Sequence, residues 1–203
     1  LWVLGASLIL YLLGYAGSVA VLSRAMIVTS LLGIVIYNWG WPVFRIIAFP
    51  LFFLFFMVPV PDSIYGFFAF PLQLFATKAA TALIELTSIP VLREGNMLYF
   101  AQTQLEVAEA CSGLQSMVSY LMLGALFAYI MPAGWPHRLV LVLSAIPLAV
   151  LVNIVRVTGT GILAHFWGAR VARGFLHEFS GIAVFVLGFL FLAMEYTLLK
   201  KKH

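Results

Sequence analysis

The sequence contains little charge and almost no cysteine. Charged residues make up 9% of the 203 positions and hydrophobic residues 64%, whereas a soluble domain carries roughly 25% charged residues. So few charges cannot cover a water-facing surface of this size, which excludes a soluble globular enzyme and a disordered chain. The single cysteine excludes an intrachain disulfide, and with it a disulfide scaffold. The composition therefore indicates that lipid is the solvent.

Apolar runs recur along the whole chain. A spanning helix needs about 20 mostly apolar residues, and we expect about seven spans within one membrane domain over residues 1–203, with some residues missing before Leu1. The expected spans are 1–22, 25–39, 46–60, 63–86, 112–131, 139–165 and 175–199. We expect the sixth to be broken late by two glycines, and the count before residue 90 stays open. The predicted fold class is an all-α polytopic bundle.

Residues 87–110 differ from the rest because this short segment holds three of the seven acidic residues. Pro90 and the turn signal at 94–96 break any helix there. Alternation of apolar and polar residues favours two short strands, 91–99 and 104–107. Open strand edges do not occur in hydrocarbon. We therefore expect a small extracytoplasmic β-hairpin around residues 90–108, lying on the membrane surface.

The basic residues give a weak orientation. Lysines at 200–202 favour a cytoplasmic C-terminus, and counting back then places five basic residues inside and four outside. The net charge of +4 does not indicate nucleic acid, because three of the eleven basic residues are these flanking lysines. Whatever the absolute orientation, the alternating helices bring Cys111, Arg156 and His177 to the same membrane face.

Arg156 carries the strongest single signal. It lies in the apolar stretch 150–157, and burying an arginine costs at least roughly 2.5–3.5 kcal/mol, so an ionisable residue there indicates a functional site. Asn153 and Thr160 fall on the same helix face. The alternative is an arginine whose side chain extends to the lipid headgroups.

Cys111 is ambiguous alone, because a single membrane cysteine is more commonly a small apolar filler. It is followed by a polar stripe at Ser112, Ser116 and Ser119, which otherwise indicates close helix packing. A helix N-terminus and a nearby cation would favour its thiolate, whereas Glu109 would oppose it. We therefore keep both interpretations of Cys111, a filler and a reactive thiol.

His177 lies at a span end, where histidine is usually an interfacial side chain. Level with a cysteine and an arginine, it is also a candidate for proton transfer, since imidazole titrates near neutrality. His165 is its main rival on that face, and His137 falls on the other. Scattered histidines without a metal-binding spacing and the lack of a phosphate-binding loop predict no metal and no cofactor.

Three segments resemble the signature segments of the exosortase/archaeosortase family, in their order and in successive spans. They are Glu109-Ala-Cys-Ser-Gly-Leu114, Asn153-Ile-Val-Arg156 and His177-Glu-Phe-Ser-Gly181. The resemblance is clear over residues 90–199 and looser over 42–89. The archaeal branch has a second arginine where this chain has His177, so the resemblance favours a bacterial exosortase.

The resemblance implies a membrane thiol peptidase or transpeptidase, with Cys111 as nucleophile, Arg156 as its cationic partner and His177 as the proton-transfer residue. Glu109, Ser112 and Asn153 would support them. It also implies a multi-pass protein of the bacterial inner membrane whose active site faces the periplasm. The implied partners are membrane lipids and membrane-anchored proteins with a C-terminal sorting signal, made of a Pro-Glu-Pro motif, a transmembrane helix and a basic tail, which accompany exopolysaccharide production.

Two rivals remain. One is a non-enzymatic transporter or assembly component of exopolysaccharide export, in which Arg156 binds an anionic solute and Cys111 only packs. The other is an intramembrane serine peptidase using Ser112 or Ser116, which is disfavoured because the Gly-x-Ser-x-Gly pattern is missing. The choice between hydrolysis and transfer, and the acceptor group, stay open.

Overall fold

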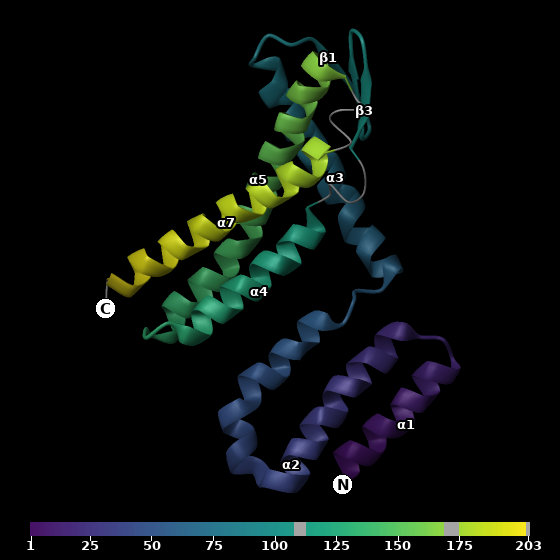
Figure 1. The fold of residues 1–203 in the computed structure, drawn as a ribbon, viewed down its shortest axis with the longest axis vertical. Helices are drawn as coiled ribbons and strands as arrows, with labels where there is room; N and C mark the ends of the chain where they lie inside the picture. The colour runs from purple at the N-terminus through teal and green to yellow at the C-terminus, as the bar shows by residue number, and fades with distance from the viewer. Residues whose placement is uncertain (108–112, 169–174, 202–203) are drawn as a thin grey trace. The chain divides into compact units, whose positions relative to one another are not determined.

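The computed structural model describes residues 1–107, 113–168 and 175–201, with side chains at all of these positions except 62–63 and 175–180. The chain divides into two compact units, Leu1–Ile64 and Tyr65–His203. Figure 1 colours the first unit purple to blue and the second blue to yellow. Each unit is described by itself below, and the single membrane domain expected from the sequence stays a prediction.

The first unit is built from α1 (Trp2–Ala16), α2 (Ala20–Phe53) and the 3-10 turn η1 (Leu54–Met57). The Ser7 and Ser30 hydroxyls are 2.9 Å apart and join α1 to α2. A Cβ atom at Gly33 would lie 3.1 Å from the Leu4 backbone, so glycine permits this close packing. Gly40, with φ 75° and ψ 179°, breaks α2 between two tryptophans, in the gap between the two spans expected at 25–39 and 46–60.

The count of about seven spans is not confirmed. Among the described residues, four helical segments are long and apolar enough to cross a membrane, Ala20–Met57, Ile64–Glu85, Trp135–Trp167 and Gly181–Lys201. Two apolar helices are shorter, Trp2–Ala16 and Leu114–Ile130. The expected first span is cut short because the chain turns at Ser18, whose φ is 56°.

The second unit contains α3 (Asp62–Glu85, most of which lies in it), a small sheet, and then α4 (Leu114–Ile130), α5 (Trp135–Trp167) and α7 (Phe175–Lys201). Helices α4, α5 and α7 pack against one another in pairs. The predicted late break in the sixth span is wrong, because α5 continues through Gly159 and Gly161. Gly161 instead makes room for Ile84, whose Cδ1 would lie 2.7 Å from a Cβ there.

The sheet has three strands where a two-stranded hairpin was expected. They are β1 (Val91–Glu94), β2 (Met97–Phe100) and β3 (Gln104–Glu106), antiparallel in the order β1-β2-β3. The predicted first strand, 91–99, contained its own turn signal. In the structure, Gly95 has φ 61° and reverses the chain there, so one predicted strand becomes two.

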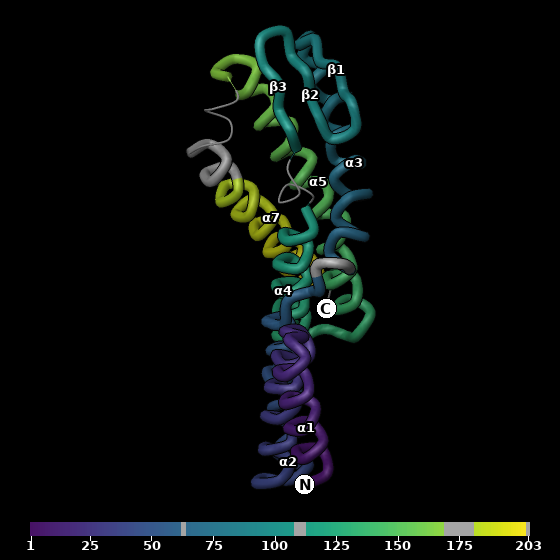
Figure 2. The backbone as a smooth tube through the Cα atoms, turned by 90° about the vertical axis from the view of Figure 1, so that its right-hand side faces the viewer, coloured from purple at the N-terminus to yellow at the C-terminus, as the bar shows by residue number. Residues whose placement is uncertain are grey.

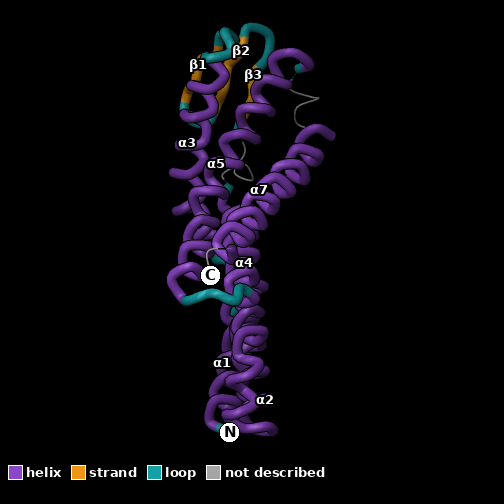
Figure 3. The backbone as a smooth tube through the Cα atoms, turned by 90° about the vertical axis from the view of Figure 1, so that its left-hand side faces the viewer, coloured by secondary structure: helices purple, strands orange, loops and turns teal. Residues whose placement is uncertain are grey.

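The sheet lies beside α3 and the C-terminal part of α5, as Figures 2 and 3 show. One face of it is buried through Leu98, Phe100 and Leu105. These side chains share a core with residues of α3 and α5, namely Ala76, Ala80, Ile84, Ile154, Val157 and Ala164. A second core joins α4, α5 and α7 around Tyr120, Leu141 and Leu192. The two cores tie the sheet and the last three described helices into one unit.

A polar contact also joins α5 to α7 within their apolar lengths. The Ser144 hydroxyl donates to the Glu195 carboxylate at 2.6 Å. We expect Ser144→Ala to lower the free energy of unfolding by about 1 kcal/mol, because intramembrane hydrogen bonds are worth roughly 0.6 kcal/mol on average and an acidic acceptor raises that value. Denaturant unfolding in detergent micelles measures the change.

Ser119→Ala is the matched control, because its hydroxyl bonds only to Gln115 O of its own helix in the contacts resolved there. An equal loss of stability in both variants would contradict a specific role for the Ser144–Glu195 contact.

Candidate functional site

The start of α4 is packed tightly against α5. Gly113 is the N-cap of α4 and has φ 85°, a left-handed conformation that favours glycine. A Cβ atom at this position would lie 2.9 Å from Cγ and 3.0 Å from Nδ2 of Asn153. Asn153 is itself buried. The predicted supporting residue Asn153 therefore lies against the backbone two residues after Cys111.

Arg156 follows Asn153 by one helical turn and faces α7. Its Nη2 lies 3.9 Å from the position a Cβ would take at Gly181. Gly181 is four residues after His177, one turn along α7. The side chain is partly buried, so its guanidinium lies at a helix–helix boundary. Thr160 was expected on the same polar face of α5. Its hydroxyl donates to the backbone carbonyl of Arg156 at 2.8 Å, so it bonds within its own helix.

Two side-chain amides hold the chain where it approaches residue 108. Gln73 of α3 is buried, and its Nε2 donates to the Val107 carbonyl. The same carbonyl accepts from Asn96 Nδ2 at 3.3 Å, while the Val107 N–H donates to Asn96 O at 2.9 Å. The chain is thus anchored at Val107, four residues before Cys111, by α3 and by the turn between β1 and β2.

A small cavity lies at this junction. Its volume is about 10 Å³, close to the space of one water molecule. Its lining comes from α3, α4 and α5 and is apolar apart from one side chain: Leu72, Ala76, Gly113, Met117, Val150 and Asn153. The carboxamide of Asn153 therefore gives this junction a polar wall.

The predicted residues stand as follows. Glu109, Cys111 and Ser112 lie outside the described residues. His177 lies in the first turn of α7, and its side chain is among those not described. Asn153 and Arg156 are described, one against Gly113 and one against Gly181. The expected convergence of thiol, guanidinium and imidazole stays a prediction.

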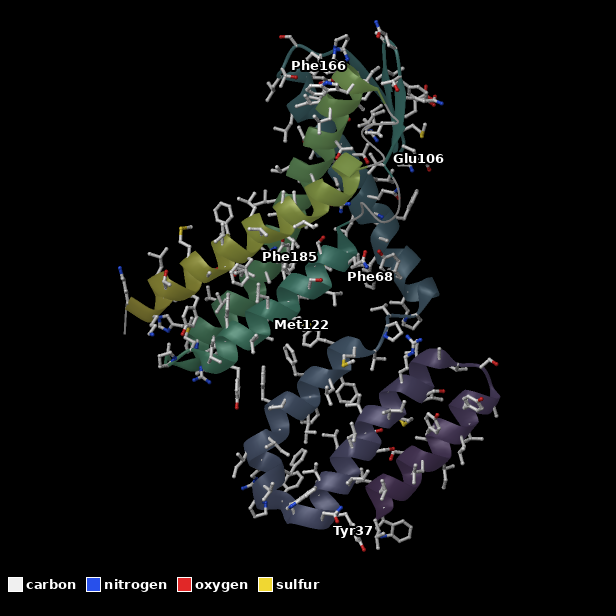
Figure 4. The ribbon with its side chains drawn as sticks, viewed as in Figure 1. Tyr37, Phe68, Glu106, Met122, Phe166 and Phe185 are labelled. Atoms are coloured by element: carbon white, nitrogen blue, oxygen red, sulfur yellow. The ribbon has the colours of Figure 1, made fainter. Side chains whose placement is uncertain are left out.

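The rival histidines have other surroundings. The His165 ring lies 6.0 Å from the Phe100 ring and 5.0 Å from the Phe166 ring, so it packs among aromatic side chains nine residues beyond Arg156. Figure 4 labels Phe166 beside the sheet. His137 lies at the opposite end of α5. Within the parts of the chain that the structure describes, no three His, Cys, Asp or Glu side chains gather closely enough to hold a metal ion.

Three residues of this region were missed in the sequence. Gln73 lies in an expected span, where its amide was a signal that was not used. Gly113 enters the sequence analysis only as a member of the first signature segment, and its positive φ has no signature in the sequence. Tyr120, which is fully buried, resembles any aromatic residue of a spanning helix.

The sequence profile of the transmembrane exosortases matches residues 1–194. The chain belongs to the transmembrane exosortase family. Neither a curated protein nor a solved structure matches it. Family membership agrees with the apolar helices, and the exosortase is a multi-pass membrane protein.

Gly113 of this exosortase provides a direct test of the junction. We expect Gly113→Ala to destabilise the protein by at least about 1–2 kcal/mol, because alanine is strained at φ 85° and its Cβ would clash with Asn153. Gly159→Ala is the matched control, since Gly159 has open space around it and alanine favours a helix by about 1 kcal/mol. Thermal unfolding in micelles compares the two, and equal melting temperatures would contradict the close contact.

The Val107 anchor predicts a second effect. Replacing Gln73 with leucine keeps the apolar volume and removes the amide that holds the Val107 carbonyl. We expect the thiol of Cys111 to react with a maleimide at least about threefold faster, because loss of a local anchor raises the open population of the following segment. Thr77→Val is the control, since that hydroxyl bonds to Gln73 O within α3. An unchanged rate of maleimide reaction would contradict a role for Gln73 in holding this segment.

Proposed function

We propose that this exosortase is a membrane-embedded cysteine peptidase or transpeptidase in which Cys111, Arg156 and His177 form the reacting centre. One observation carries the proposal. Two positions on α5, one turn apart, contact the start of α4 two residues after Cys111 and the turn of α7 that follows His177. Asn153 and Arg156 thus connect the segment before α4, which bears Cys111, with the start of α7, which bears His177.

The environment of the thiol supports its role as nucleophile. Cys111 precedes the N-cap of α4 by two residues, and the partial positive charge at a helix N-terminus favours a thiolate. In this proposal Arg156, one turn after Asn153 on α5, supplies a full positive charge to the same centre. Asn153 supports the centre by packing under Gly113. Glu109 and Ser112 keep the supporting roles that the resemblance implies.

The proposed chemistry proceeds in two halves. The Cys111 thiolate attacks the scissile carbonyl carbon, and the carbonyl oxygen takes up the negative charge, which Arg156 stabilises. As the C–N bond breaks, His177 gives its proton to the leaving amine, and a thioester remains. His177 then takes a proton from the acceptor as it attacks the thioester, which releases the thiolate. Water as acceptor gives hydrolysis, and an amine or hydroxyl acceptor gives transfer.

The proposed substrates are exported proteins with a Pro-Glu-Pro motif, a transmembrane helix and a basic tail. Such a helix lies in the same bilayer as the enzyme, which confines the encounter to two dimensions and presents the motif at the membrane face. We place the centre at the periplasmic face of the inner membrane, in agreement with the weak charge bias of the loops.

The test follows processing of a reporter protein that ends in such a signal, with enzyme and reporter in the same vesicles. We expect Cys111→Ala and Cys111→Ser to lower the cleavage rate at least about a thousandfold, as loss of a nucleophile does. Arg156→Lys should cost about a hundredfold, because a point charge does not reproduce the planar guanidinium. Immunoblots of reporter length measure cleavage. A hydroxylamine-sensitive adduct on Cys111 detects the thioester intermediate.

Arg138→Gln is the matched control, since this arginine donates to Met131 O and Ala133 O in the loop at the far end of α5. It should leave cleavage unchanged. Normal processing by both Cys111 variants would overturn the peptidase. If thiol alkylation also had no effect while Arg156→Gln abolished uptake of an anionic solute, the transporter alternative would replace it.

A further inference from the structure

Tyr120 of α4 contacts α7 through both a hydrogen bond and a stacked ring. Its side chain is fully buried. Its hydroxyl donates to the Val184 carbonyl at 2.9 Å and lies 3.5 Å from Phe185 O. Its ring stacks on the Phe185 ring, with centroids 5.7 Å apart and planes 10° apart. Phe185, labelled in Figure 4, lies on α7 in the region between α7 and α4.

Gly188 makes this contact possible. A Cβ atom at this position would lie 2.3 Å from the Tyr120 Oη and Cζ atoms and 2.5 Å from Cε1. The Tyr120 ring lies directly against the backbone of α7, so a methyl group at this position would force the ring out of its place. In an α-helix the Val184 carbonyl also accepts the N–H of Gly188. Tyr120 is therefore inserted against a single turn of α7.

The position of the contact along both helices matters for the site. Helices α4 and α7 run in the same direction (Figure 1). Tyr120 is seven residues after Gly113, and Val184 is seven residues after His177. Seven residues of helix correspond to about 10.5 Å on each side of the contact. The contact therefore lies about two helical turns beyond Gly113 on α4 and about two helical turns beyond His177 on α7.

Resting on the proposed function, we propose that Tyr120 and Gly188 are positioning residues that set the height of α7 against α4, and thereby the approach of the His177 imidazole to the Cys111 thiol. A hydroxyl donating to one backbone carbonyl fixes a height, whereas apolar packing alone permits sliding by a turn. Arg156 cannot fix this height by itself, because a long flexible side chain beside Gly181 tolerates a shift of α7.

The experiment measures the geometry without needing substrate. The chain has one cysteine, so His177→Cys creates a single pair of thiols, which a short thiol-specific cross-linker such as dibromobimane bridges with a gain in fluorescence. In micelles, adding Tyr120→Phe should lower the bridging rate about threefold, the equivalent of one intramembrane hydrogen bond. Adding Gly188→Ala should lower it at least tenfold, and Tyr120→Ala together with Gly188→Ala should recover part of that loss.

Tyr129→Phe is the control, because it removes a hydroxyl from an exposed position of the same helix. It should leave bridging unchanged. In the chain with native His177, Tyr120→Phe should lower kcat for the reporter and leave KM unchanged. Unchanged bridging in both the Tyr120→Phe and Gly188→Ala chains, with only a lower melting temperature, would overturn this inference alone. Failure of the His177→Cys chain itself to bridge would overturn the inference and the proposed reacting centre together.

Discussion

The second unit depends on side chains that pack directly on a neighbouring helix backbone at glycine. Lipid tails are as apolar as the side chains they contact, so helices in a membrane associate through tight packing and hydrogen bonds. Gly113 receives the carboxamide of Asn153, and Gly188 receives the ring of Tyr120. Both are contacts that a single methyl group would prevent. The polar groups of α4 and α5 thus reach their neighbours because two positions on the facing helices have no side chain.

The same constraint explains how an arginine is tolerated in an apolar helix. A guanidinium at the centre of a lipid-facing helix is costly, whereas one at a helix–helix boundary replaces lipid by backbone and other polar groups. Arg156 lies at such a boundary, beside Gly181. Its neighbour Asn153 faces α4 one turn earlier. One short stretch of α5 therefore serves two interfaces, and these are the interfaces that lead to Cys111 and His177.

Hydropathy and the signature segments predicted the last three helices well, because long apolar runs with few breakers leave little choice of structure. The ends of α4 and α7 fall within two residues of those expected. Sequence patterns did not predict the features that tertiary packing determines. Gly161 was taken as a break, yet it accommodates Ile84 within a continuous helix. The turn at Gly95 was noticed but not used to divide the first strand, and a sheet of three strands resulted.

The candidate site was predictable by residue type but not by its supports. An arginine in an apolar run stands out in any sequence, because placing a guanidinium in a spanning helix costs free energy that a functional role would justify. Gln73 and Tyr120 are not, because each owes its role to one backbone carbonyl, Val107 O or Val184 O, far away along the chain. These carbonyls belong to a segment beside the candidate nucleophile and to the helix that carries the candidate proton donor. Side chains that hold the backbone in place, rather than those that react, therefore determine whether the three predicted groups meet.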